Sequence, residues 1–537
     1  MTGSKMQIFQ GESLNNWRDG DMGRTHYPRL AENLSADVCV VGGGLTGLTT
    51  AYLLQRAGKA VVVLDSQELA RGETSRTTGH LTTVLDTRYA QLEKDFDTPT
   101  MALIAQSHQM AVGLVQKIIA EENIDCACYP VTGYMLAAGE EQQAELNREV
   151  AAAGKAGFAS WKKLSEIRIG NFTWQNGGME VPQQVIFHPV KYMLKLAEII
   201  ASRGGVIRTG NPVVEVHGGA EPYIITHDGF RVDAQSIVVS THTPINDRLT
   251  MHTKQAAYRS YSISFRVAKD SYPPFMMWDM NDPYHYARTV SGDSYDMLVV
   301  GGEDHKTGQA NDGELRYQAI EAWTRALFPD VRQVLYKWSG QIINSVDGIA
   351  LIGRNPGEKN IYIATGFSGT GMTYATIAAI VIRDLVMGNE NMLEHIYDPS
   401  RKMLNNLGKY FSENTNAIGH LMSDFVAPAE ADSDEDIAPG EGAIIRRGLH
   451  KIAAYRDEQG RLHECSAACT HLGCTVQWNA TERSWDCPCD GSRYAIDGRV
   501  LHGPATIPLS RVNEPAAAGR IPDEAQPLAN TPPPDPA

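Results

Sequence analysis

The chain has 537 residues, of which 42% are hydrophobic and 21% are charged. A domain typically has about 100–200 residues, so this length predicts two to four domains with cores that need no disulfide support. The composition excludes a mostly disordered chain, and no uncharged apolar run reaches the roughly 20 residues that a membrane-spanning helix needs. With 48 Lys and Arg against 63 Asp and Glu, the net charge of -15 disfavours a nucleic-acid partner. The N-terminus has no apolar signal-peptide core, so we expect a cytoplasmic protein without a membrane partner.

The first predicted elements form half of a doubly wound α/β domain. Residues 36–41 are a short apolar run of the buried-strand type, residues 48–57 have helical periodicity, and residues 60–65 are a second apolar run. This order of strand, glycine-rich turn, helix and strand is typical of a dinucleotide-binding domain.

The turn after the first strand carries the pattern Gly42-x-Gly44-x-x-Gly47. Glycines let the backbone turn tightly and approach a pyrophosphate, which the free N–H groups of the following helix bind. Asp65, at the end of the second strand, is placed to accept hydrogen bonds from ribose hydroxyls. An acid at this position disfavours a 2′-phosphate, so the motif argues against NADP.

Later segments predict a second sheet that lies over the nucleotide domain. Residues 189–203 have the pattern of an amphipathic helix, and short strands are expected at 213–216 and 237–240. Residues 255–345 are rich in strand-forming residues and predict an antiparallel sheet. Residues 361–366 again read as a strand that ends in glycine, and a helix follows it.

The composition changes towards the C-terminus. A stretch rich in acidic residues, Ala, Pro and Gly is typical of a linker, and the segment after it has many short strands and turns. The last residues are rich in Pro and Ala and are predicted to be disordered. The expected parts are an N-terminal extension at 1–30, interleaved nucleotide-binding and substrate subdomains at 31–425, the linker at 426–442, a small all-β domain at 443–512 and the tail at 513–537.

The eight cysteines are unevenly distributed, since five lie at 465, 469, 474, 487 and 489. A cluster of this kind in a long chain predicts a local metal or redox site rather than a disulfide framework. Its two motifs are Cys-Thr-His-Leu-Gly-Cys at 469–474 and Cys-Pro-Cys-Asp-Gly-Ser at 487–492.

The larger part of the chain resembles the D-amino-acid-oxidase/glycine-oxidase superfamily of FAD-dependent oxidoreductases. The resemblance runs from about residue 36 to about residue 401 and is carried by segments 38–65, 71–83, 338–353 and 361–379. It implies an α/β FAD-binding Rossmann-type domain with an antiparallel β substrate domain.

The same resemblance implies FAD held without a covalent bond. The family's covalent histidine lies where this chain has Thr77, so His80 is expected to be a neighbour of the cofactor. A second glycine loop precedes a helix whose positive end is expected to face the flavin and stabilise its reduced form. The implied FAD contacts are Gly42, Gly44, Leu45, Thr46, Gly47, Asp65, Ser66, Thr77, Thr78, Gly79, His80, Leu81, Val213, Thr241, Gly366, Gly369, Thr370, Gly371 and Met372.

The cysteine motifs resemble the two loops of a Rieske [2Fe-2S] domain. The resemblance implies that Cys469 and Cys487 hold one iron, that His471 holds the other, and that Cys474 and Cys489 form a disulfide. The family has a second histidine where this chain has Asp490. A cluster ligated by Asp490, a cluster with water or another residue at that iron, and no cluster at all are three open outcomes. A zinc site is the alternative metal centre, and an empty Rieske-like scaffold is the alternative role.

Together these features predict an enzyme that oxidises the C–N bond of a small amine or amino acid. A carbon beside nitrogen gives a hydride to the flavin, and water hydrolyses the imine that remains. Electrons are expected to pass from the flavin to the cluster and then to an acceptor that the sequence does not name. Four residues are candidate substrate contacts because they are polar or aromatic and lie in strand-like surroundings: Tyr258, Arg259, Tyr261 and His285. The rival hypotheses are an electron-transfer flavoprotein that serves a protein partner, and an oxygen-using oxidase whose C-terminal domain is structural.

Overall fold

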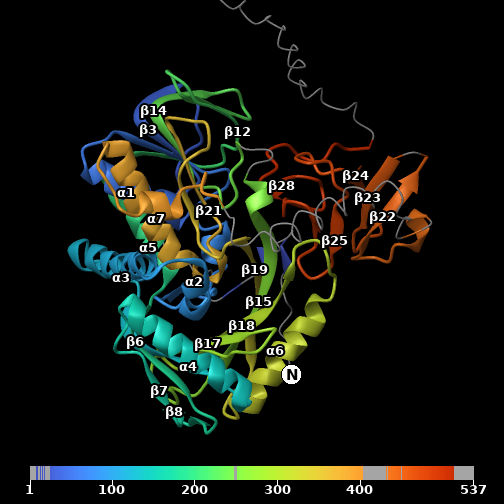
Figure 1. Ribbon diagram of the computed structural model, residues 1–537. Helices are drawn as coiled ribbons and strands as arrows, with labels where there is room; N and C mark the ends of the chain where they lie inside the picture. The colour runs from blue at the N-terminus through green and yellow to red at the C-terminus, as the bar shows by residue number, and fades with distance from the viewer. Residues whose placement is uncertain are drawn as a thin grey trace, which may run out of the picture.

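The computed structural model describes residues 8–9, 12–13, 15, 17, 25–246, 251–402, 431, 433–448 and 450–512. The predicted tail, most of the N-terminal extension and part of the predicted linker lie outside these residues. Figure 1 shows an α/β part, a large second sheet next to it, and a smaller β domain on the other side of that sheet.

The nucleotide-binding part is built on one mixed sheet of eight strands. Its strands are β3 (Leu34–Val41), β4 (Val61–Leu64), β11 (Val206–Arg208), β12 (Val213–His217), β13 (Tyr223–Thr226), β14 (Arg231–Val239), β20 (Leu351–Arg354) and β21 (Ile361–Thr365). The order is β11-β4-β3-β14-β13-β12, with β21 paired to β14 and β20 to β21. The central strands β11, β4, β3, β14 and β21 are parallel. Buried parallel strands need apolar side chains on both faces, which explains the continuous apolar runs in the sequence.

Helices pack on and around this sheet. They are α1 (Leu45–Arg56), α2 (Tyr89–Asp95), α3 (Thr98–Glu121), α4 (Gly139–Ala156), α5 (Pro189–Ser202), α7 (Gly371–Met387) and α8 (Glu394–Tyr397). Among the described residues, one helical segment, Ser368–Met387, is long and apolar enough to span a membrane, but 72% of it is buried inside the protein. Its apolar character is therefore that of a core helix, which packs against α1 and α3.

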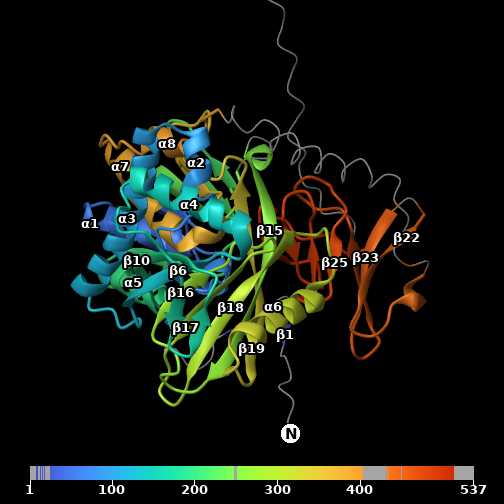
Figure 2. The same cartoon turned by 60° about the horizontal axis from the view of Figure 1, so that its bottom comes forward.

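The second sheet has nine strands and is largely antiparallel. Its strands are β5 (His80–Leu81), β6 (Tyr129–Leu136), β7 (Lys162–Leu164), β10 (Gly178–Ile186), β15 (Gln255–Val267), β16 (Phe275–Trp278), β17 (His285–Val290), β18 (Asp296–Lys306) and β19 (Val334–Ser345). The order is β19-β15-β18-β17-β16-β6-β10-β5, with β7 on β10 and a parallel pair at β16 and β6. Helix α6 (Gly313–Leu327) lies along β15 and β18 (Figure 2). Two short hairpins join β1 (Ile8–Phe9) to β2 (Glu12–Ser13) and β8 (Ile167–Ile169) to β9 (Phe172–Trp174).

The C-terminal domain contains only strands and loops, apart from one short 3-10 turn at Asp434–Asp436, in the part that is described. A three-stranded sheet is formed by β22 (Gly442–Arg447), β23 (His450–Arg456) and β24 (Leu462–Ser466). A four-stranded sheet is formed by β25 (Gln477–Asn479), β26 (Ser484–Asp486), β27 (Arg493–Tyr494) and β28 (Val500–His502). The predicted fold class, an α/β nucleotide domain with an antiparallel β domain and a C-terminal all-β domain, is confirmed.

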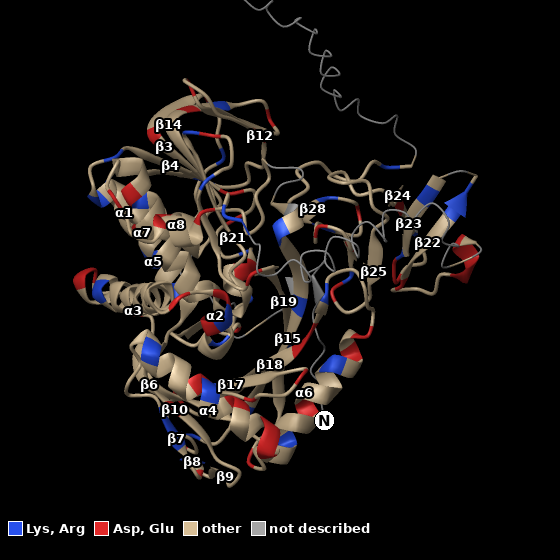
Figure 3. Ribbon diagram, in the orientation of Figure 1, with Lys and Arg blue, Asp and Glu red and all other residues tan. Residues whose placement is uncertain are grey.

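The C-terminal domain docks on the rest of the chain through buried charges. Most charged residues lie on the surface, for example along helices α4 and α6 (Figure 3). Glu482 of the C-terminal domain is an exception, since its side chain is only 1% exposed. Its carboxylate lies 3.1 Å from Arg76 of the nucleotide-binding part, 3.7 Å from Arg259 of β15 and 3.7 Å from Arg493 of β27. Asp486 pairs with Arg493 at 3.0 Å. We call these five residues the junction cluster.

The junction cluster joins three parts of the chain at one point. Burial alone would raise the pKa of Glu482, but Arg76, Arg259 and Arg493 outweigh burial and hold the pKa at about 2. A charge that is buried without a partner costs several kcal/mol, so these side chains are compatible with burial only while the domains stay docked.

Glu482→Gln is expected to lower the free energy of unfolding by about 3 kcal/mol or more, because it leaves buried guanidinium groups without their counter-charge. The matched control is Glu458→Gln, which removes the partly exposed pair with Arg483 at 3.1 Å and should cost less than about 1 kcal/mol. Urea unfolding of the two variants and the parent chain measures this difference, and equal losses would contradict the assignment.

The same carboxylate predicts a pH dependence of stability. Its pKa is lower in the folded chain than the ordinary value of 4.5, so its stabilising contribution is present at neutral pH and is lost as the pH falls from 4.5 towards 2. The unfolding temperature of Glu482→Gln should therefore change less over this pH range than the unfolding temperature of the parent chain.

Candidate active site and metal centre

The glycine turn between β3 and α1 is shaped by close backbone packing. Gly42 has a φ of +107°, and a Cβ on it would lie 2.5 Å from the Ser240 carbonyl oxygen. A Cβ on Gly47 would lie 1.9 Å from the Gly42 carbonyl oxygen. These two glycines are required by the turn itself. A Cβ on Gly44, by contrast, would meet only Thr74 Oγ1, at 3.3 Å, and would project into the cavity that Gly44 lines.

Asp65 holds the same turn from the end of β4. Its Oδ2 accepts from Gly43 N at 2.8 Å, and its Oδ1 accepts from Gln67 N at 2.8 Å. Burial raises the pKa of Asp65 to about 6, although the two backbone hydrogen bonds oppose the rise. Asp65 also lines the cavity beside the turn, so its predicted contact with a ribose stays geometrically open.

Two adjoining cavities follow the expected course of the cofactor. The first cavity lies beside the glycine turn and is lined by Gly42, Gly44, Asp65, Ser66, Val213 and Thr241 of the predicted set. The second cavity is lined by Thr46, Thr77, Thr78, His80, Gly369, Thr370, Gly371 and Met372. Both are lined by Glu73, Ser240 and His242, so they meet at these residues. Leu45, Gly47, Gly79, Leu81 and Gly366 are not among the lining residues of either cavity.

The loop that leads into β5 is held by a buried arginine. Arg288 of β17 donates to the carbonyl oxygens of Gly79, at 2.6 Å, and Thr78, at 3.2 Å. Burial lowers the pKa of Arg288 to about 9, and burial together with Arg288 lowers the pKa of His80 to about 3. His80 is therefore a neutral imidazole at the wall of the second cavity, with its Nδ1 3.0 Å from Thr78 Oγ1. Its Nε2 is buried, and a backbone hydrogen bond with Ala287 opposes the fall in the pKa of the ring.

The N-terminus of α7 also faces the second cavity. Gly369, Thr370 and Gly371 line the cavity at the point where the short 3-10 turn Ser368–Thr370 runs into the helix. Free N–H groups and the helix dipole make this end electropositive. Gly369 N donates to the Asp86 carboxylate, which lines the same cavity.

The four predicted substrate contacts lie outside the second cavity. Arg259 belongs to the junction cluster, and Tyr261 contacts His305 Nε2 at 3.0 Å and packs on Tyr317. His285 pairs with Asp279 at 3.1 Å and stacks on Trp323. Tyr258 lies at the start of β15 and is not among the lining residues either.

The alternation of side chains along strands explains this placement. Successive residues of a strand point to opposite faces, so Ser260 and Ser262 line the cavity while Tyr261 lies in the core beneath α6. In the same way Tyr284 and Tyr286 line the cavity while His285 faces away from it. Sequence reasoning overlooked these serines and tyrosines because aromatic or basic character alone does not say which face of a strand looks inward. The signal that could have found them is the Ser-x-Ser pattern at 260–262.

The cysteine loops of the C-terminal domain bring the predicted ligands together. Sγ of Cys469, Sγ of Cys487 and a carboxylate oxygen of Asp490 lie within 4.8 Å of one another. His471 Nδ1 lies 2.8 Å from Asp490 Oδ2. All four side chains are buried or nearly so. Asp490 thus lies at the position predicted for the fourth ligand, and the two sulfurs, one imidazole and one carboxylate would offer a donor set for an iron–sulfur cluster.

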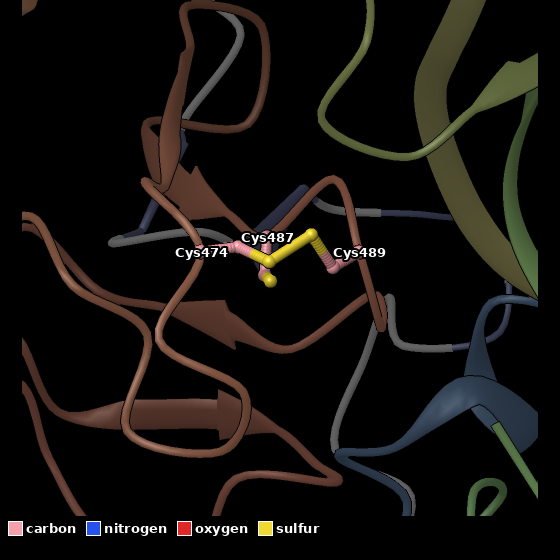
Figure 4. A group of neighbouring side chains, drawn as sticks. All are labelled: Cys474, Cys487 and Cys489. Atoms are coloured by element: carbon pink, nitrogen blue, oxygen red, sulfur yellow. A yellow bond between two sulfur atoms is a disulfide. The ribbon is translucent and has the colours of Figure 1, made fainter. Parts of the chain in front are cut away.

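Two further features support the loops. Cys474 and Cys489 are joined by a disulfide, and Cys487 lies beside it (Figure 4). Burial raises the pKa of the Cys487 thiol well above its ordinary value, and the neighbouring Cys469 and Asp490 add to the rise. Tyr494 OH lies 3.2 Å from Cys469 Sγ, and a hydrogen bond to a ligand sulfur raises the reduction potential of a cluster.

The second cysteine loop is in contact with the wall of the second cavity. Gln341 of β19 lines that cavity, and its Nε2 donates to the Gly491 carbonyl oxygen at 3.0 Å. A Cβ on Gly491 would lie 2.4 Å from Ala257 Cβ, which shows how closely the loop approaches β15. Gln341 therefore both lines the predicted flavin cavity and contacts the loop that carries Cys487 and Asp490.

Two segments of the chain match two different protein families. Residues 37–385, well over half of the chain, match the family described as FAD dependent oxidoreductase. The chain belongs to this family. Residues 428–513 match the Rieske [2Fe-2S] domain. The cofactors of this FAD dependent oxidoreductase are accordingly FAD and a [2Fe-2S] cluster.

Relatives of this FAD dependent oxidoreductase share one or both parts. YhfW of Bacillus subtilis (strain 168), named as a Rieske 2Fe-2S iron-sulfur protein, is 32% identical over 91% of this chain and 95% of its own length. Gamma-glutamylputrescine oxidoreductase of Escherichia coli (strain K12) is 24% identical over 68% of this chain and 86% of its own. Glycine oxidase from Geobacillus kaustophilus has a similar fold, with a TM-score of 0.56 and 18% identity over 69% of this chain and all of that one.

Gly44→Ala is expected to weaken FAD binding about tenfold or more, the equivalent of about 1.4 kcal/mol, because the new methyl group occupies the approach of the pyrophosphate. The backbone at Gly44 has a φ of -77°, so alanine fits the turn itself. The control is Gly113→Ala on α3, where a Cβ meets nothing within 4 Å. Titration of the apo-protein with FAD, followed by flavin fluorescence, measures both; equal affinities would contradict the role of Gly44.

Asp490→His is expected to raise the reduction potential of the cluster, because a neutral imidazole replaces a carboxylate that favours the oxidised metal. The control is Asp497→His at an exposed site of the same domain. Iron and sulfide analysis and EPR-monitored redox titration, under anaerobic conditions, compare the variants. A potential that changes equally in both, or not at all, would show that Asp490 does not ligate iron.

Proposed function

We propose that this chain oxidises the C–N bond of a small amine or amino acid in the second cavity and that the electrons leave through the C-terminal cluster. The observation that carries the proposal is that Gln341 lines this cavity and donates to Gly491 of the second cysteine loop, because this contact supports a short path from the cavity to the cluster. Bound FAD supplies a two-electron acceptor for the carbon beside nitrogen, and the cluster supplies a one-electron acceptor.

The second cavity is suited to a small amine. Its volume of about 310 Å³ has to be shared by the flavin half of the cofactor and the substrate, and Trp278, Tyr284 and Tyr286 line it together with Ser260 and Ser262 of β15. Aromatic rings can hold a small substrate in one orientation. The polar groups that we propose as substrate contacts are therefore Ser260, Ser262 and the two tyrosine hydroxyls.

The charges of the cavity wall favour a substrate that carries an ammonium group. Glu73, Asp86 and Asp279 line the cavity, whereas its lining arginines are Arg76 and Arg88. Arg76 is engaged by Glu482, and Arg88 pairs with Glu145 at 2.5 Å. A carboxylate is best held by an arginine that is available for a bidentate contact. We therefore expect amines without a carboxylate beside the reacting carbon to be oxidised faster than amino acids.

The experiment is anaerobic mixing of the purified holoprotein with a panel of mono-, di- and polyamines and of D- and L-amino acids. Bleaching of the flavin spectrum measures its reduction, and EPR of frozen samples measures reduction of the cluster. We expect an amine to bleach the flavin first and the cluster signal to appear afterwards. Rapid reduction by NADPH and none by any amine would identify a reductase instead.

Two cysteine variants separate the proposal from its rivals. Cys487→Ser removes a cluster ligand and should leave flavin bleaching by the amine intact while the EPR signal is lost. Cys465→Ser changes a buried free cysteine of the same domain that is not a predicted ligand, and should leave both signals unchanged. If Cys487→Ser is re-oxidised by oxygen as fast as the parent chain, the C-terminal domain is structural and the chain is an oxygen-using oxidase.

A further inference from the structure

The C-terminal domain forms one wall of the first cavity. On one side the cavity is lined by the nucleotide-binding part, including Gly42, Gly44 and Asp65, and by Asn211, Pro212 and Val213. It is also lined by the end of the C-terminal domain, at Arg499, Val500, Leu501, His502, Gly503, Ala505, Thr506 and Pro508. In Figure 1, β28 lies between the nucleotide-binding sheet and the rest of its own domain.

This wall is attached to the nucleotide-binding part by direct contacts. Gln67, two residues after Asp65, donates from Nε2 to the Leu501 carbonyl oxygen at 2.9 Å. His502 Nε2 lies 3.4 Å from Glu73 Oε1, and both side chains are 12% exposed. Glu73 lines both cavities, and its Oε2 accepts a hydrogen bond from Gln341 N at 2.7 Å. Glu73 therefore connects His502 of the C-terminal domain to Gln341 of β19 at the point where the two cavities meet.

The position of the wall relative to the glycine turn determines what it covers. The turn binds a pyrophosphate, and the adenosine half of a dinucleotide extends from there past the strand end that carries Asp65. The first cavity has a volume of about 380 Å³ at this place. We infer that the C-terminal domain is part of the FAD site, and that residues 499–508 cover the adenosine half of the cofactor.

A coupling between cofactor and domain position follows. A ligand that contacts two domains binds more tightly when they are docked, and by linkage its binding stabilises the docked arrangement by the same factor. Bound FAD would thus stabilise the docked position of the C-terminal domain, which carries the cluster. This inference rests on the FAD site and the domain contacts, and it does not depend on which substrate is oxidised.

The test uses two neighbouring positions of the covering loop in the full-length chain. Thr506 is half-buried and lines the cavity, whereas Ile507 is 48% exposed and does not. Thr506→Trp places a large side chain in the adenosine space and should weaken binding of both FAD and ADP to the apo-protein by about tenfold or more. Ile507→Trp adds the same side chain outside the cavity and should bind both as the parent chain does. FMN, which lacks the adenosine half, should bind equally to all three proteins.

A second measurement needs no variant. Hydrogen–deuterium exchange of the unmodified apo-protein should show slower exchange in peptides covering 499–507 when FAD or ADP is added, and no such change with FMN. Unchanged exchange in these peptides, or FAD and ADP affinities of Thr506→Trp equal to those of the parent chain, would overturn the inference. Loss of FMN binding in Thr506→Trp would show a general defect in folding, and the exchange experiment would then decide alone.

Discussion

The arrangement of this enzyme depends on charges that are buried where three parts of the chain meet. Glu482 comes from the C-terminal domain, and its three arginine neighbours come from the FAD-binding loop, from β15 and from β27. Each of these groups would be costly to bury alone. The three arginine charges are balanced by Glu482, Asp486 and the nearby Glu73. Separating the domains would remove the pairs of Glu482 with Arg76 and Arg259, whereas the pairs of Arg493 with Glu482 and Asp486 lie within the C-terminal domain. Because ion pairs require particular partners at short distances, the junction cluster allows fewer orientations of the C-terminal domain than an apolar contact of the same size would.

That fixed position explains why the two redox sites share a boundary. Arg76 of the junction cluster lies in the loop that lines the second cavity, and Gln341 links the wall of that cavity to Gly491. The ion network and the Gln341 contact lie on the same face of the second sheet as the cysteine loops. A cluster held there keeps one distance from the flavin cavity, whereas a flexibly attached domain would sample many distances. The docking contacts thus contribute to electron transfer although none of their residues reacts.

Asp490 gives the cluster site a charge that a Rieske domain with two histidine ligands lacks. The carboxylate lies next to both a cysteine sulfur and the remaining imidazole, so its negative charge acts on the metal directly. A carboxylate at the metal favours the oxidised state. Tyr494, whose hydroxyl lies against Cys469 Sγ, acts in the opposite direction. If Asp490 ligates the iron, these two neighbours shift the reduction potential of the cluster in opposite directions.

The sequence by itself determined what depends on local chemistry. The glycine turn, the strand and helix around it, and the spacing of the cysteine loops are short-range patterns, because each requires particular residues within a few positions of one another. For that reason the sequence alone predicts FAD contacts at Gly42 and Asp65 and cluster ligands at Cys469 and Asp490. The antiparallel sheet was also predictable, since its strands are rich in β-formers.

Tertiary structure alone decided which side chains meet. Arg259 is basic and lies in a strand, which made it a candidate for a substrate carboxylate, but its partner Glu482 is more than 200 residues away in the sequence and belongs to another domain. The inward face of β15 was set by the packing of α6 against Tyr261, and this packing turns Ser260 and Ser262 to the cavity. No local pattern encodes either outcome, because a strand has two equivalent faces and a buried charge pairs with whatever the fold brings beside it.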